Sequence, residues 1–186
     1  MKIASLLILA MLLGGCGVGP KQLPPVGNYD FGLATDNAPK LAVKSISQIE
    51  VAAPRWLDSV NLYYRLAYID PAQPRAYTQT KWVMPPASLV ESRLKERAVA
   101  GGATVGSSGP VLRVELDEFS QVFTSSSASK AVLRARVSLV SSRDVLRQKA
   151  FAIEEPATTA DGPGGAAALK RAAEGFVDAA LAWAGQ

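Results

Sequence analysis

VLRVELDEFSQVFTSSSASKAVLRARVSLVSSRDVLRQKAFAI, residues 111–153, is the stretch that decides the fold of this chain. Between its segments lie short polar pieces, TSSSAS at 124–129 and SSRD at 141–144, which have the composition of turns. Apolar and polar side chains alternate along the rest, and a period of two is typical of β-strands. We therefore predict a meander of three antiparallel strands: residues 111–123, 131–140 and 145–153.

Shorter segments upstream of this meander have the composition of further strands. They are rich in aromatic and β-branched residues, which favour extended backbone. We expect four such strands: residues 29–33, 41–51, 62–69 and, more weakly, 77–83.

The hydrophobic period changes to that of a helix after Pro85-Pro86. Ser88 and Glu91 form the S-x-x-E pattern of a capping box, which marks the start of a helix. The glycines at 101–102 supply a C-terminal cap. The apolar face of this predicted helix recurs every four residues: Val90, Leu94 and Ala98.

A second helix is expected at the end of the chain. Residues 158–165 have the Gly and Pro content of a loop. From Leu169 to Ala184, apolar residues repeat at intervals of three and four, and their many alanines suit close packing on a sheet. The order of strands, helix, strands and helix predicts a single α+β domain over residues 29–186, with a mainly antiparallel sheet and both helices packed on one face.

The first sixteen residues look like the signal of a bacterial lipoprotein. Lys2 precedes an apolar run that is too short to span a bilayer, so we interpret residues 1–15 as a signal peptide. Leu13-Gly14-Gly15-Cys16 resembles a lipobox, in which a signal peptidase cuts before the cysteine and acyl chains such as palmitate are attached to it. We predict lipidation at Cys16, the single cysteine of the chain. The alternative is a plain signal peptide in which this cysteine is incidental.

Residues 16–28 are expected to be a lipidated tether. They are rich in Gly and Pro, and the part from 17 to 28 reaches about 40 Å when it is fully extended. Gly17, rather than Asp, follows Cys16. By the usual sorting pattern of such lipoproteins, we expect a protein that is lipid-anchored in the outer membrane and faces the periplasm.

The composition argues against several classes of function. The chain has no histidine, which removes histidine-based catalysis and histidine metal ligands, and it contains no P-loop. Asp117 and Glu118 are adjacent carboxylates, and a regular strand points them to opposite faces. The net charge of +4 comes from scattered residues, which is not a nucleic-acid footprint. We therefore expect no enzyme, no metal or other cofactor and no nucleic-acid partner.

Aromatic residues gather between residues 56 and 82, with basic residues among them. Strands favour aromatic side chains in a core, and Trp, Tyr and Arg also anchor protein interfaces. Both interpretations stay open, and each could hold for one face of the strands. The cluster comprises Trp56, Tyr63, Tyr64, Tyr68, Tyr77 and Trp82, interleaved with Arg55, Arg65, Arg75 and Lys81.

Several short motifs follow one another along the chain in a characteristic order. After the lipobox come a short segment with Tyr29, an I-x-V-x-x-P strand end at 49–54, a Y-Y-R-L segment at 63–66 and a Y…W…P stretch before the first helix. This order resembles the ABC-type transport auxiliary lipoproteins (the PqiC/YmbA type), although residues 29–33 are more polar than the usual aromatic run. The residues that match the family's aromatic stretch, and that the resemblance marks as partner-binding, are Trp56, Tyr64, Arg65, Tyr77, Trp82 and Pro85.

The resemblance implies a non-enzymatic periplasmic lipoprotein. Such proteins are auxiliary components of ABC-type or MCE-type lipid transport systems that maintain the outer membrane, and they are thought to dock the periplasm-spanning component there. Some members form rings, so a homo-oligomeric ring is a further expectation. Two alternatives remain: a structural or assembly lipoprotein for outer-membrane or cell-wall biogenesis, and a lipid carrier with its own cavity.

Overall fold

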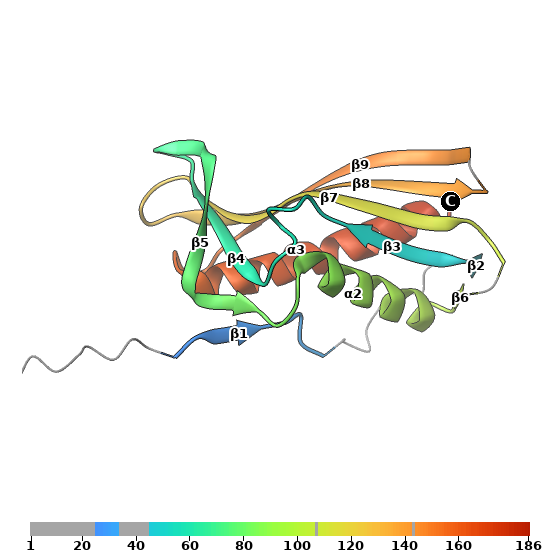
Figure 1. The fold of residues 1–186 in the computed structure, drawn as a ribbon, viewed down its shortest axis with the longest axis horizontal. Coiled ribbons are helices and arrows are strands. Elements are labelled where there is room, and N and C mark those ends of the chain that lie inside the picture. Colours follow the sequence, from blue (N-terminus) through green and yellow to red (C-terminus); the bar gives the residue numbers. More distant parts are fainter. Residues whose placement is uncertain (1–24, 34–44, 107, 143) are drawn as a thin grey trace, which may run out of the picture.

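The computed structural model describes residues 25–33, 45–106, 108–142 and 144–186 (Figure 1). The two helices of this part are α2 (Pro86–Ala100) and α3 (Gly162–Ala184). The strands are β1 (Gly27–Tyr29), β2 (Ser45–Ile46), β3 (Gln48–Ala52), β4 (Asn61–Leu66), β5 (Asp70–Trp82), β6 (Thr104–Val105), β7 (Val111–Phe123), β8 (Ser129–Ser141) and β9 (Asp144–Pro156).

A seven-stranded sheet forms one layer of the molecule. It runs in the order β1-β5-β4-β7-β8-β9, with β3 beside the first part of β7. The predicted meander β7-β8-β9 is antiparallel, as is the β4–β5 pair, whereas β1 pairs parallel with β5, and β3 and β4 pair parallel with β7. Helices α2 and α3 lie on one face of the sheet (Figure 1), which confirms the predicted single α+β domain. We call the opposite face of the sheet the outer face.

The core lies between the long strands and α3. Alternate side chains of β7 and β8 point inward, and small residues on α3 let the helix approach them closely. Phe151 of β9 meets Phe176 of α3 edge-on, with 5.6 Å between the ring centroids. The fully buried apolar side chains of α3 include Ala168, Leu169, Ala172, Ala173, Phe176, Val177, Ala180 and Leu181.

A β-bulge in β7 corrects the prediction for the adjacent carboxylates. Leu116 faces Ala135 and Glu118 faces Arg134, so Asp117 is an extra residue between two regular pairs. Because the extra residue shifts the alternation, Leu116 and Phe119 both lie in the core. Asp117 and Glu118 consequently share the outer face instead of pointing to opposite faces.

Helix α2 begins three residues before its predicted start. Its N-cap is Pro85 and no side chain caps this end, so the predicted capping box of Ser88 and Glu91 is wrong. The earlier start follows from Pro86, because a proline suits the first helical position. The glycine cap is confirmed at the other end, where Gly102 has φ +89° and its N–H donates to the carbonyl of Val99 at 2.9 Å.

Helix α3 begins at Gly162, inside the segment 158–165 that we expected to be a loop. Asp161 is its N-cap and accepts a hydrogen bond from a backbone N–H of the first turn. A Cβ atom at Gly165 would lie 2.1 Å from Oε1 of Gln121 in β7. These glycines therefore allow the first turn of α3 to pack closely against the sheet.

The first strand also differs from its prediction. β1 ends at Tyr29 rather than continuing to Leu33, because the Asp30 carboxylate accepts a hydrogen bond from the N–H of Gly32 at 2.7 Å. Gly32 has φ +64°, a conformation that favours glycine and turns the chain out of the strand.

The remaining upstream strands occupy the expected regions with other bounds. The predicted strand 41–51 is represented by β2 and β3, and its residues 41–44 lie outside the described part. β5 begins at Asp70, ahead of the predicted 77–83. The added part contains Pro71 and Pro74, which argue against a central strand but are tolerated at an exposed sheet edge.

Candidate functional site

The residues predicted from the sequence to be functional do not form one site. Cys16 lies outside the described residues. Trp82 is only 2% exposed and packs against Phe31 and Phe119, with ring centroids 5.9 and 5.7 Å away. It is a core residue, and Pro85 is half-buried at the N-cap of α2.

Tyr64 and Tyr77 lie on the helix-covered side of the sheet. Their ring centroids are 4.6 Å apart. The Tyr77 hydroxyl donates to Oε1 of Gln121 at 2.9 Å, and Nε2 of Gln121 donates to Oγ of Ser129 at 2.7 Å. Burial, reinforced by Tyr64 and Asp161, raises the pKa of Tyr77 above its ordinary value. These contacts give the pair a structural role beneath the start of α3.

Trp56 and Arg65 lie together on the outer face. The Arg65 guanidinium stacks over the Trp56 ring at 5.2 Å from its centroid, and Tyr63 meets the same ring edge-on at 5.4 Å. Nη2 of Arg65 also pairs with Oε2 of Glu118 at 2.8 Å. The bulge at Asp117 places Glu118 where it can make this contact. The indole is thus held in a fixed orientation by its neighbours.

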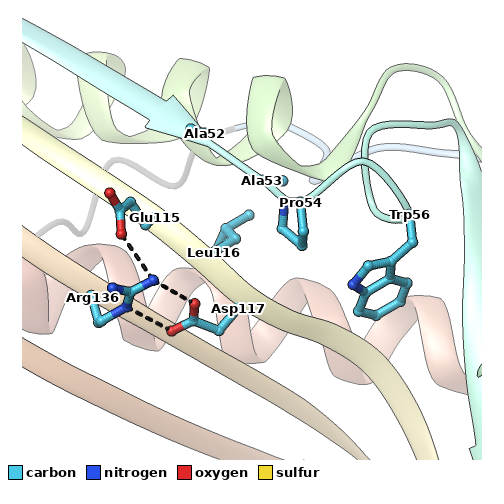
Figure 2. Close-up of a pocket in the computed structure, with 8 residues that line it drawn as sticks. All are labelled: Ala52, Ala53, Pro54, Trp56, Glu115, Leu116, Asp117 and Arg136. Carbon is cyan, nitrogen blue, oxygen red and sulfur yellow. Dashed lines mark hydrogen bonds and ion pairs between the residues drawn. The ribbon is translucent and has the colours of Figure 1, made fainter.

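A shallow cavity of about 480 Å³ opens beside Trp56 on the outer face (Figure 2). β3 pairs with β7 as far as Ala52 and Glu115, and β4 takes over at Tyr63 and Ser120. Among the described strands, residues 116–119 of β7 therefore have no partner on this side. The cavity is lined by Ala52, Ala53, Pro54, Trp56, Glu115, Leu116, Asp117 and Arg136.

Arg136 of β8 forms the charged end of the cavity. Its guanidinium lies between two carboxylates, with Nη2 at 2.9 Å from Oε2 of Glu115 and at 3.0 Å from Oδ1 of Asp117 (Figure 2). The hydrogen bond with Asp117 and the charges of both carboxylates raise its pKa. About half of the Arg136 side chain remains exposed, so the guanidinium can still contact a ligand.

The cavity combines an apolar side with a charged side. Trp56 and Pro54 offer flat apolar surface, while Arg136, Glu115 and Asp117 offer directed hydrogen bonds. This mixture is typical of polypeptide recognition, in which buried aromatic and arginine anchors carry much of the binding energy.

Two further features are absent from the described part of the chain. It contains no cluster of three or more His, Cys, Asp or Glu side chains that could hold a metal ion. None of its helices has the length and apolar character needed to cross a membrane.

Sequence reasoning found part of this cavity and missed the rest. Trp56 was predicted, and the I-x-V-x-x-P motif contains Pro54. Glu115, Asp117 and Arg136 were missed because they are charged residues on the polar faces of regular strands. These three side chains lie together because of the strand pairing and the bulge in β7. No local sequence pattern predicts either feature.

Comparison with known proteins agrees with the fold and gives a family. The sequence profile described as "ABC-type transport auxiliary lipoprotein component" matches residues 33–180. A search of curated proteins finds no match.

Two crystal structures are similar to this chain over most of its length. Protein XCC0632 from Xanthomonas campestris, of family DUF330, is 19% identical with a TM-score of 0.72, and the match covers 84% of this chain and 94% of that one. An uncharacterized protein is 14% identical with a TM-score of 0.63, and the match covers 87% of this chain and 97% of that one. At these identities the similarity shows a shared fold.

Proposed function

The chain belongs to the ABC-type transport auxiliary lipoprotein family, and on this premise we propose that it is a non-enzymatic lipoprotein that docks a component of an ABC-type or MCE-type lipid transport system. Acylated Cys16 would hold it on the periplasmic side of the outer membrane. The observation that carries the docking role is the outer-face cavity between Trp56 and Arg136 (Figure 2).

The outer face suits a protein partner because the fold leaves it uncovered. Both helices pack on the other face, where α3 buries its apolar side chains against β7, β8 and β9 (Figure 1). Trp56 is held by Arg65 and Tyr63 before any partner arrives, so binding costs little side-chain entropy there. The carboxylates around Arg136 fix its guanidinium in the same way.

The cavity favours a polypeptide over a lipid tail as its occupant. Glu115, Asp117 and Arg136 place three charged groups around it, and burying charges against an acyl chain is costly. The alternative of a carrier with its own lipid cavity therefore gains nothing from this site. A transported lipid would be held by the partner rather than by this domain.

Site-specific crosslinking in intact envelopes tests the proposal. A photoreactive phenylalanine derivative replaces Trp56 in one variant and Arg136 in another. We expect both to capture a permease-associated, ATPase-associated or MCE-type protein, identified by mass spectrometry. Both positions should capture the same protein, since both line one cavity.

The matched control is the same photoreactive residue at Val99, which is 60% exposed on α2, away from the outer face. We expect no capture of the transport component from this position. The docking proposal fails if the two cavity positions capture no such component, or if Val99 captures it as efficiently.

A further inference from the structure

One end of the molecule gathers the start of the described chain and two loops. β1 begins there, and the β4–β5 hairpin, the β7–β8 turn and the first turn of α3 reach the same end of the long axis (Figure 1). The first described residue, Pro25, lies nine positions after Cys16. Nine extended residues span about 30 Å, so an anchor at Cys16 keeps this end close to the membrane.

The tip of the β4–β5 hairpin exposes large apolar side chains at this end. Tyr68 is 47% exposed and Ile69 is 63% exposed. Both belong to the three-residue connection between the strands, which is held by a hydrogen bond from the N–H of Ile69 to the carbonyl of Leu66 at 2.9 Å. The N–H of Ala67 also donates to the carbonyl of Phe123 at 3.0 Å, which fixes the hairpin to the end of β7. The exposed pair is therefore held outward by an ordered turn.

The loops around this tip carry little charge of their own, and the nearest basic groups are the guanidinium groups of Arg65 and Arg75, which donate to Pro71 and Gln73 of the hairpin. The hairpin segment 67–74 reads AYIDPAQP and the β7–β8 turn at 124–128 reads TSSSA. Their single charged residue is Asp70, whose carboxylate accepts a hydrogen bond from the N–H of Ala72 at 2.8 Å. By contrast, at the opposite end of the molecule β9 begins with the charged residue Asp144.

We propose that the β4–β5 hairpin tip contacts the interface of the phospholipid bilayer that carries the lipid anchor, and this rests on the lipidation of the proposed function. Tyrosine is favoured at the headgroup level because its ring is apolar and its hydroxyl remains hydrated. Ile69 would reach toward the acyl boundary, and the low charge of the surrounding loops limits the cost of desolvation. The anchor supplies a high local concentration of membrane, so this contact needs little affinity of its own. Its effect is to orient the domain, with its long axis rising from the membrane.

A fluorescent label on the full mature chain tests this contact. An acylated Cys16 has no free thiol, so Ile69→Cys provides a unique site for a maleimide dye that is sensitive to polarity. The matched control is Leu146→Cys, because Leu146 is 55% exposed and belongs to β9, next to the β8–β9 turn. Each labelled protein is reconstituted in vesicles of phosphatidylethanolamine and phosphatidylglycerol, with and without a nitroxide-bearing phospholipid.

We expect the label at position 69 to shift to shorter emission wavelengths on vesicles and to be quenched by the nitroxide lipid. The label at position 146 should keep its aqueous spectrum. The hairpin contact is overturned if position 69 stays aqueous while the protein floats with the vesicles, a result that leaves the anchor intact. If the unsubstituted chain fails to float, or if Cys16 itself accepts the dye, the anchor and this proposal both fall.

Discussion

The extra residue at Asp117 changes which side chains share a face of β7. In a regular strand, Leu116 and Phe119 would point to opposite faces, and one of them would leave the core. The bulge lets both be buried and brings Asp117 and Glu118 to the outer face, where they pair with Arg136 and Arg65. A single inserted residue thus fixes two of the arginine contacts around the cavity.

Tyr77 should make the stability of the fold depend on pH in the alkaline range. Its ordinary pKa is 10.0, and burial raises the pKa in the folded state. The unfolded chain therefore loses this proton near pH 10 while the folded chain keeps it, so the free energy of unfolding falls as pH rises above about 10. The slope should stay below the ~1.4 kcal/mol per pH unit of one fully coupled proton, because Tyr77 is only half-buried.

Chemical denaturation of the unsubstituted chain and of Tyr77→Phe, measured at several values between pH 8 and pH 11, checks this linkage. The substitution should lower stability at pH 8, because Gln121 loses a hydrogen-bond donor, and should flatten the decline above pH 10. Parallel declines in the two proteins would show that Tyr77 is not the group responsible.

At the scale of elements, the sequence was most informative where one hydrophobic period continues over many residues. The three strands of residues 111–153 run for about a dozen residues each, so their alternation identifies them, and the apolar stripe of α3 does the same for the final helix. The start of α2 was misplaced because Ser88 and Glu91 were taken as the cap instead of the local signal of Pro86. The start of α3 was misplaced because its decisive contact is not local. At α3, glycines that resemble a loop are needed where the helix meets Gln121.

Gly165→Ala should separate the close-approach role of this glycine from ordinary helix propensity. The new Cβ would meet Oε1 of Gln121 at 2.1 Å, and the glutamine would have to give up its bond with Tyr77. We expect a loss of about 1–3 kcal/mol in the free energy of unfolding. Gly175→Ala is the control, because its nearest neighbour, Ile153 Cγ2, is 4.0 Å away; it should stabilise α3 by about 0.5–1 kcal/mol.

Both variants are measured by urea denaturation followed by circular dichroism. Because the predicted effects at these two glycines of one helix have opposite signs, the comparison is strict. A stabilising Gly165→Ala would mean that the first turn of α3 can shift away from β7 at no cost.

The outer-face cavity could be predicted only in part. The aromatic and arginine content of residues 56–82 indicated an interface, but it did not distinguish Trp82 in the core from Trp56 at the surface. That distinction depends on which strands pair. β4 and β5 belong to one sheet with β7, and Trp82 packs against Phe119 in the core. The charged rim comes from β7 and β8, far from Trp56 in the chain.

On the scale of the whole molecule, Arg93 connects both helices to the N-terminal segment, residues 25–33. It is 5% exposed on α2 and pairs with Glu174 of α3 at 2.8 Å. The same guanidinium donates to the carbonyls of Phe31 and Gly32 at 3.0 and 2.6 Å. Two helices and the N-terminal segment therefore meet at one side chain.

Arg93→Ala should loosen that segment and lower stability by about 2–3 kcal/mol, because it removes several hydrogen bonds from a charged donor. Hydrogen exchange should rise in residues 25–33 more than in β7 or β8. Lys95→Ala is the control on the same helix, since its pair with Glu91 is at the surface and contributes less than about 1 kcal/mol. Unchanged exchange in residues 25–33 would show that the β1–β5 pairing and the packing of Phe31 hold the segment without Arg93.

Cys16→Ser tests whether the whole domain is held to a membrane by this one residue. Serine cannot form the thioether on which acylation depends, and two or more acyl chains are what makes such anchoring stable. We expect the variant to accumulate as an uncleaved precursor or as a soluble periplasmic species, whereas the unsubstituted chain fractionates with the outer membrane. Because Cys16 precedes the folded domain, any soluble form should unfold at the same temperature as the lipidated one.

A Cys16→Ser variant that still fractionates with the outer membrane would contradict the anchor. The β4–β5 hairpin alone is not expected to retain the protein there, since Tyr68 and Ile69 bury too little area to replace acyl chains.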